Sequence, residues 1–272
     1  MRTGTLVLTL VLFGTISEAA EPPLTGQAAA LYRQAQRGHW FADSEKLQPN
    51  IQPTSDGRSF FLIWKGSREP KHWIVSLHGT QGFATDDLVL WSREANGRDV
   101  GLLCLQWWLG AGDGPAAYYT PQQAYRQIET ALAAIGAQPG TVMFHGFSRG
   151  SSNAYAIVAL DAGRGRRYFS LAVASSGGVN VDYPPTRAIA NGEFGPRPLE
   201  GTRWITSAGA RDPHPDRDGI AGMRRTAIWL KEQGAIVVDL IEDPRGGHGA
   251  LKTNPQNTKR VLDLFLKFPT SD

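Results

Sequence analysis

The feature that most constrains the fold of this chain is a regular alternation of short apolar runs with helical patterns. Several of the apolar runs are continuous, without alternation, as expected for strands covered by helices on both faces. They lie at 60–66, 72–79, 100–106, 141–147, 169–176, 203–209 and 236–243. Helical patterns lie near 85–96, 121–135, 149–162, 218–233 and 258–268. The alternation predicts an α/β fold with a central, mostly parallel sheet flanked by helices on both faces.

The N-terminal residues do not fit this alternation and have the pattern of a secretory signal. Arg2 supplies a positive charge, residues 6–16 form an apolar stretch, and Ser17-Glu18-Ala19 is a small-x-small cleavage sequence. The apolar stretch is shorter than the ~18 residues that a spanning helix needs. We therefore predict a signal peptide at 1–19, a single domain at 20–272, a secreted or periplasmic location and no stable membrane insertion.

Composition narrows the class of function. The formal net charge is +3, and the basic residues are dispersed along the chain. The densest basic cluster, at 164–167, is short and interrupted by a glycine, which favours a solvated loop over a nucleic-acid surface. Cys104 is the only cysteine, so no intrachain disulfide can form. It lies in an apolar run and is expected to be buried.

The sequence Gly146-Phe147-Ser148-Arg149-Gly150 stands between a predicted strand and a predicted helix. A Gly-x-Ser-x-Gly motif in that context places a serine hydroxyl on a sharp turn above the sheet. The glycines let the strand and helix backbones pass closely. Short motifs also occur by chance, so the structural context has to support this one. We predict that Ser148 is a nucleophile.

A serine nucleophile needs a general base, and His248 is the best placed histidine. It follows the last predicted strand in the glycine-rich sequence PRGGHGA, which lets the imidazole reach over the sheet edge. His78 and His145 end strands beside glycines and are expected to pack in the interior. The others are less suited to the role: His39, His72 and His214.

The orienting acid is expected after the strand that precedes the histidine strand, in the order serine, aspartate, histidine. Asp212 lies just past the run at 203–209 and is our prediction. Asp216 and Asp218 follow closely and stay open as alternatives. More distant candidates are Asp182 and Asp243.

The cluster of Asp212, His214, Asp216 and Asp218 also fits a metal site on residue type alone. It lacks the glycine and the distal glutamate of a calcium loop. A polar turn explains it more simply, so we predict no metal.

Backbone amides are expected to stabilise the oxyanion of an acyl-transfer reaction. One donor is the amide of Arg149, the residue after the predicted nucleophile. The second is expected in the loop 78–82, which follows an earlier strand. Thr80 is the first choice in that loop and Gln81 the second.

These motifs together resemble the α/β-hydrolase superfamily over roughly residues 58–268. The matching features are the His-Gly loop at 78–79, the elbow at 146–150, then Asp212 and His248 in that order. The chain is similar to compact serine esterases of the dienelactone-hydrolase or polyester-depolymerase branch and lacks the HGGG loop of another branch. The resemblance implies hydrolysis of a small or polymeric carboxylic ester through an acyl-enzyme, without a cofactor.

Sequence says less about the substrate. Trp107 and Trp108 follow a strand and are candidates to line a substrate pocket, although packing beneath the next loop explains them equally well. The irregular segments before Thr120 and at 176–203 are candidates for a small cap over the site. Three alternatives remain: a serine peptidase, an acyltransferase and a non-catalytic binding protein with the same fold. The oligomeric state is not indicated.

Overall fold

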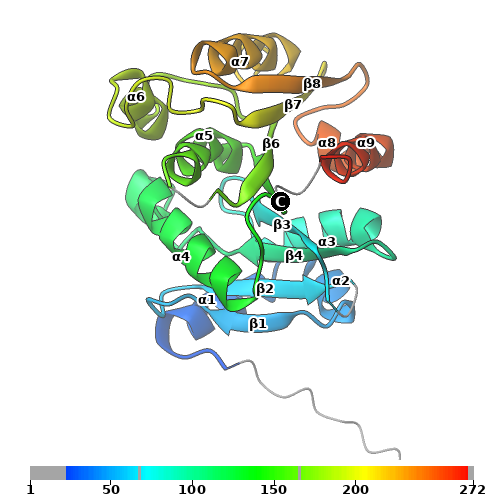
Figure 1. Cartoon of the computed structure of the whole chain (residues 1–272). Helices are drawn as coiled ribbons and strands as arrows, with labels where there is room; N and C mark the ends of the chain where they lie inside the picture. The colour runs from blue at the N-terminus through cyan, green and yellow to red at the C-terminus, as the bar shows by residue number, and fades with distance from the viewer. Residues whose placement is uncertain (1–22, 67–68, 165–166, 269–272) are drawn as a thin grey trace, which may run out of the picture.

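The computed structural model describes residues 23–66, 69–164 and 167–268, so the predicted signal peptide at 1–19 lies outside the described residues. An eight-stranded sheet runs through the molecule in the order β1-β2-β4-β3-β5-β6-β7-β8 (Figure 1). The strands are β1 (Asn50–Pro53), β2 (Phe60–Lys65), β3 (His72–Leu77), β4 (Val100–Leu105), β5 (Val142–Phe147), β6 (Phe169–Ser175), β7 (Arg203–Gly209) and β8 (Ile236–Asp243). β2 pairs antiparallel with both β1 and β4, and every other pairing, from β4 to β8, is parallel.

Helices cover both faces of this sheet (Figure 1). They are α1 (Gly26–Ala35), α2 (Phe41–Lys46), α3 (Ala84–Ala95), α4 (Pro121–Ala134), α5 (Arg149–Ala162), α6 (Pro184–Ala190), α7 (Ile220–Glu232), α8 (Ala250–Thr253) and α9 (Pro255–Phe265), with a 3-10 turn η1 (Pro115–Ala117). α3, α8 and α9 lie on one side, and α4, α5 and α6 on the other. The predicted fold class is therefore confirmed.

Burial on both faces explains why the strands read as continuous apolar runs. In β4, Leu103 and Leu105 pack into the core beneath α4 and α5, whereas Leu102 and Cys104 pack into the core beneath α3 and α9. All four side chains are fully buried. Because successive residues of a strand point to opposite faces, a strand between two helix layers must be apolar at every position.

Local signals in the sequence set the helix boundaries. The Thr120 side chain accepts a hydrogen bond from the Gln123 amide at 3.2 Å, and Pro121 occupies the first turn of α4. Gly136, with φ +74°, follows the end of that helix and adopts the left-handed conformation that glycine favours.

No helix within 23–66, 69–164 and 167–268 is long and apolar enough to cross a membrane. The domain boundaries at 1–19 and 20–272 stay predictions.

Candidate active site

Ser148 lies at the turn between β5 and α5, with φ +53° and ψ −116°. This conformation is rare for a residue with a side chain and is maintained only by its surroundings. A Cβ on Gly146 would lie 2.4 Å from the Gly150 carbonyl oxygen, and one on Gly150 would lie 2.3 Å from the Leu77 carbonyl oxygen. The glycines of the motif are therefore required because the strand and helix backbones cross in contact.

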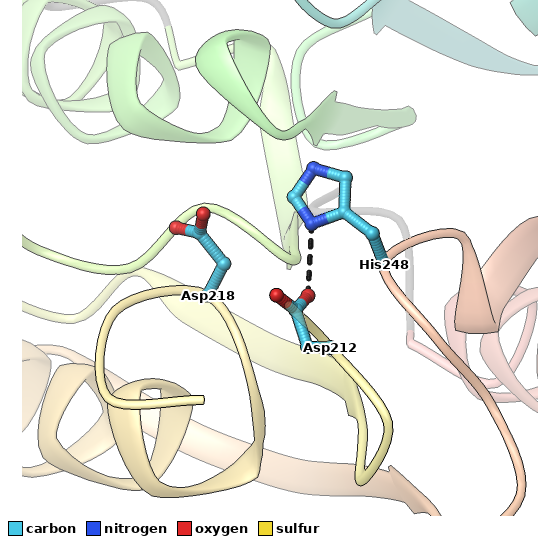
Figure 2. Close-up of side chains that lie close together, drawn as sticks. All are labelled: Asp212, Asp218 and His248. Carbon is cyan, nitrogen blue, oxygen red and sulfur yellow. Dashed lines mark hydrogen bonds and ion pairs between the residues drawn. The ribbon is translucent and has the colours of Figure 1, made fainter. Parts of the chain in front are cut away.

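The structure brings Ser148, His248 and Asp212 into one hydrogen-bonded line. His248 Nε2 lies 2.9 Å from Ser148 Oγ, and His248 Nδ1 lies 2.8 Å from Asp212 Oδ2. Figure 2 shows the Asp212 bond, with the aspartate on the loop after β7 and the histidine on the loop after β8. The Asp212 side chain is fully buried, whereas His248 is 31% exposed. This arrangement can deprotonate a serine hydroxyl and stabilise the resulting imidazolium.

Backbone hydrogen bonds hold both loops of this line. Asp212 Oδ1 accepts a bond from the His214 amide at 2.8 Å, which fixes the second carboxylate oxygen. Asp243, at the end of β8, accepts bonds from the amides of Arg245 and Gly246, each at 2.9 Å. The Asn254 side chain also donates to Asp243, and these bonds lower the pKa of its carboxyl. Asp243 therefore braces the histidine loop and does not contact His248 through a described bond.

An ion pair lies beside Phe147, the residue whose ring packs against His248. The rings of Phe147 and His248 have centroids 5.2 Å apart, and Lys252 Nζ lies 4.3 Å from the Phe147 centroid. Lys252 Nζ also lies 3.4 Å from an oxygen of Asp87, whose side chain is fully buried in α3. The pair connects α3 to α8, the helix that begins directly after the histidine loop.

The alternative acids occupy different environments. Asp218 is buried, and its Oδ2 accepts bonds from Arg217 Nε and Nη2 at 2.9 and 2.7 Å. Asp216 is exposed. Ligand atoms of Asp212, Asp218 and His248 lie within 4.8 Å of one another, so these three are the described residues that could hold a metal ion. The Asp212 carboxylate already bonds His248, and the Asp218 carboxylate already bonds Arg217. We therefore interpret Asp212 and His248 as members of a catalytic triad, with the Asp218–Arg217 ion pair beside them.

The loop after β3 approaches the nucleophile closely. A Cβ on Gly79 would lie 3.3 Å from the Ser148 Cβ, so this backbone lies against the elbow. The Gln81 amide donates to the Tyr118 hydroxyl at 2.9 Å, and Trp107 Nε1 donates to the His78 carbonyl at 2.9 Å. Thr80 lies between these two anchored positions, in the wall of the cavity at Ser148. The Gln81 amide already has a partner, which favours Thr80 as an oxyanion donor.

Two cavities meet at the elbow. The first, the serine cavity, has a volume of about 170 Å³ and is lined by Ser148, Thr80, Ser152, Asn180 and Asp218 among others. The second, the aromatic cavity, has a volume of about 410 Å³ and includes in its walls Trp107, Tyr118, Tyr119, Tyr183 and Phe194. Arg149 and Tyr183 belong to both walls. The segments at 107–120 and 176–203 thus supply much of the aromatic cavity, consistent with their prediction as a cap.

The two predicted tryptophans have different positions. Trp107 is almost fully buried and lines the aromatic cavity. Trp108 donates through Nε1 to the Gly112 carbonyl at 3.0 Å and packs edge-on against Phe83, and it lines neither cavity. Trp107 therefore stays a candidate to contact the substrate, whereas Trp108 packs against the loop that follows it.

His78 and His145 are fully buried, as the sequence indicated. Burial lowers the pKa of each imidazole to about 3, so both are neutral near pH 7. Trp91 Nε1 donates to His145 Nδ1 at 3.2 Å, which makes this nitrogen an acceptor and places the ring proton on Nε2. Neither histidine belongs to the line through Ser148.

Sequence reasoning missed several residues around the site. Tyr183 accepts a 2.6 Å bond from Asn153 and lines both cavities, and Arg217 forms an ion pair with Asp218. Tyr183 directly precedes α6 in the segment between β6 and that helix, and a position before a helix is a weak signal for a site residue. Lys252, one turn after His248, carried no signal because its partner Asp87 is distant in sequence.

Comparison with known proteins identifies the fold. No protein-family model matches the sequence, and no curated protein matches it. Among solved structures, a phospholipase/carboxylesterase from Dyadobacter fermentans is 20% identical with a TM-score of 0.53, covering 76% of this chain and 96% of that one. An esterase from Pyrobaculum calidifontis is 16% identical with a TM-score of 0.62, covering 81% and 84%. An acylaminoacyl peptidase from Pyrococcus horikoshii is 13% identical with a TM-score of 0.52, covering 77% and 38%. With the observed strand order, these similarities show the α/β-hydrolase fold.

Proposed function

We propose that this protein of the α/β-hydrolase fold is a serine hydrolase that cleaves carboxylic esters through an acyl-enzyme. The observation that carries the proposal is the continuous line from Ser148 Oγ through His248 to buried Asp212, at 2.9 and 2.8 Å. Its order along the chain, and its position at the carboxyl ends of β5, β7 and β8, are those of the fold's catalytic triad. The esterase names of similar structures support the choice of an ester.

Acylation follows from this geometry. His248 Nε2 takes the proton as Ser148 Oγ attacks the acyl carbon, and the carboxylate of Asp212 stabilises the imidazolium. The negative oxygen then accepts bonds from the amides of Arg149 and Thr80. Arg149 is the first residue of α5, so its amide has no partner within the helix and points along the positive end of the helix dipole.

Acylation ends when the first oxyanion collapses and the C–O bond to the alcohol breaks. His248 gives its proton to the departing oxygen, so the alcohol leaves, His248 is again neutral and the acyl group stays on Ser148. Deacylation then uses the same residues with water as the nucleophile. His248 next takes a proton from water, whose oxygen attacks the acyl carbon of the Ser148 ester. Collapse of this second oxyanion releases the carboxylic acid and returns the proton to Ser148. No group outside the chain, the ester and water takes part.

The proposal is tested with p-nitrophenyl acetate and a fluorophosphonate probe on the purified protein. Ser148→Ala and His248→Ala are expected to lower kcat by roughly four to six orders of magnitude, and Ser148→Ala to abolish labelling. Ser170→Ala, a half-buried serine on β6, is the matched control and is expected to keep both activities. Turnover that survives Ser148→Ala contradicts the proposal.

The same experiment separates the alternatives. A peptidase or an acyltransferase would accept the phosphonate, but it would cleave an acyl-peptide, or transfer the acyl group to an added alcohol, faster than it hydrolyses the ester. A binding protein would show neither labelling nor turnover.

We further propose that the protein is exported after cleavage at Ala19. Residues 1–22 lie outside the described residues, and the proposal is carried by the sequence pattern alone. Mass spectrometry of the mature N-terminus tests it, with Ala20 expected as the first residue.

A further inference from the structure

We infer that the preferred substrates are esters of aromatic carboxylic acids, with the aromatic acyl group held in the aromatic cavity. This inference rests on the proposed function. It adds the class of substrate, and it assigns the two sides of the ester to different parts of the site.

The chemistry of the walls favours a planar ring over an aliphatic chain. Besides five aromatic side chains, four prolines line the cavity, and the aliphatic residues among its described lining are two alanines. The polar and charged residues of the wall are Thr120, Gln122, Arg149, Asn153, Arg187 and Glu193. Aromatic pairs prefer stacked or edge-to-face contacts that contribute about 0.5–1.5 kcal/mol beyond burial. The cavity volume of about 410 Å³ lies within the usual range for small-molecule sites.

A cation in the wall adds to this preference. The Arg149 guanidinium lies 4.5 Å from the Tyr118 ring centroid and is held by Asp113, with Nη2 3.0 Å from a carboxylate oxygen. The Arg149 side chain is 22% exposed and lines the cavity, so it presents surface to a bound group. A guanidinium plane stacks on an aromatic face better than on a saturated chain.

The aromatic walls are also anchored to the catalytic loop. Trp107 and Tyr118 lie with ring centroids 4.5 Å apart. Trp107 donates to the His78 carbonyl, and the Tyr118 hydroxyl accepts from the Gln81 amide. The residues that would contact the acyl ring therefore hold the loop of the oxyanion donor, so the wall is preorganised relative to Ser148.

The position of the general base assigns the cavity to the acyl side. The leaving alkoxide must receive its proton from His248 Nε2, so the alcohol of the ester lies beside that ring. No described residue of the His248 loop or of α8 lines the aromatic cavity. Its wall is built from α5, from α6 and the residues just after it, and from the first turn of α4 and the segment before it. We therefore place the acyl group, which is the part of the ester that stays on Ser148, in the aromatic cavity.

Two pairs of matched esters test the inference, one that varies only the acyl group and one that varies only the alcohol. On the acyl side, methyl phenylacetate is compared with methyl cyclohexylacetate, and on the alcohol side benzyl acetate with cyclohexylmethyl acetate. The aromatic acyl ester is expected to have about tenfold higher kcat/KM than its saturated partner, while the alcohol pair differs by less than about threefold. Equal values in the acyl pair, or a preference confined to the alcohol pair, overturn the inference.

A variant that fills the cavity provides the second test. Ala188 on α6 lines the aromatic cavity, whereas Ala190 on the same helix is exposed and does not. Ala188→Phe is expected to lower the ratio of phenylacetate to acetate kcat/KM by about thirtyfold, and Ala190→Phe to leave the ratio unchanged. An unchanged ratio in Ala188→Phe, with the fold intact by circular dichroism, contradicts the inference.

Failure of the inference is distinguishable from failure of the proposed function. If the protein is labelled by the fluorophosphonate and hydrolyses acetate esters but shows no preference for an aromatic acyl group, only the inference about the substrate is contradicted. Loss of labelling and of all ester turnover in the parent protein removes the proposed function.

Discussion

The Asp87–Lys252 pair gives a prediction that can be worked out from the structure. The Asp87 side chain is fully buried, whereas Lys252 is 23% exposed. Lys252→Met keeps an unbranched side chain at this position but removes the ammonium over the Phe147 ring, which leaves the Asp87 carboxylate without its ion-pair partner. Breaking a buried pair in this way costs about 3–5 kcal/mol, and the partial exposure of Lys252 puts the expected loss in the free energy of unfolding near 3 kcal/mol. Asp87→Asn costs only about 1 kcal/mol, because the lysine can turn to water.

The penalty depends on pH. Burial raises the pKa of the Asp87 carboxyl, and Lys252 partly opposes that rise. A raised pKa in the folded state means that the contribution to stability is largest at low pH and is lost as pH rises through that pKa. Lys252→Met raises this pKa further, so the penalty is larger at pH 8 than at pH 5, because protonation of the buried carboxyl becomes more favourable as pH falls.

Urea unfolding at both pH values measures the effect. The double variant Asp87→Asn/Lys252→Met is expected to be more stable than Lys252→Met alone by about 2 kcal/mol at pH 8. The reasoning is refuted if Lys252→Met costs the same at pH 8 and pH 5, or if the double variant recovers no stability.

Three further predictions concern the site and its supports. Asp212→Asn is expected to lower kcat by roughly four orders of magnitude, whereas Asp216→Asn changes it by less than twofold; equal losses would show that the acid is misassigned. Stability is expected to fall as pH drops below about 6.5, since buried His145, with a pKa of about 3, stays neutral while the unfolded chain takes up protons. At pH 4.5 the loss in the free energy of unfolding amounts to roughly 2–3 kcal/mol. The stability of His145→Gln, measured by urea unfolding, is therefore expected to depend less on acid pH than that of the parent protein, and substitution of the exposed His39 by Gln is the control. Tyr118→Phe, which removes the acceptor of the Gln81 amide, is expected to lower kcat about fivefold, and an unchanged kcat would exclude that bond from loop positioning.

Much of the fold could be predicted from local patterns, because a strand that is buried on both faces has a continuous run of apolar residues. Each predicted strand is found within about two residues of its expected bounds, as for β8 at Ile236–Asp243. β1, with the sequence NIQP, has no apolar run because it is a mostly exposed edge strand, and it was missed. α1 was also missed, since its apolar side is carried mainly by alanines and Leu31.

The candidate site was less completely predictable. Ser148, Asp212 and His248 could be chosen because each follows a strand, and parallel strands end at one edge of the sheet. The residues that support them carry no such mark. Lys252 acts through Asp87, which lies far away in sequence, and the Tyr118 hydroxyl reaches Gln81 only through the folded path of the cap segment. Contacts of this kind depend on tertiary packing.

The covalent intermediate offers the most direct test of the central claim. Turnover of p-nitrophenyl acetate is quenched in acid during the burst phase, and the acetyl group is mapped by peptide mass spectrometry. A single acetyl group on the peptide containing Ser148, absent from Ser148→Ala, is the predicted result. An acetyl group on another residue, or steady turnover by Ser148→Ala at the parent rate, contradicts the account.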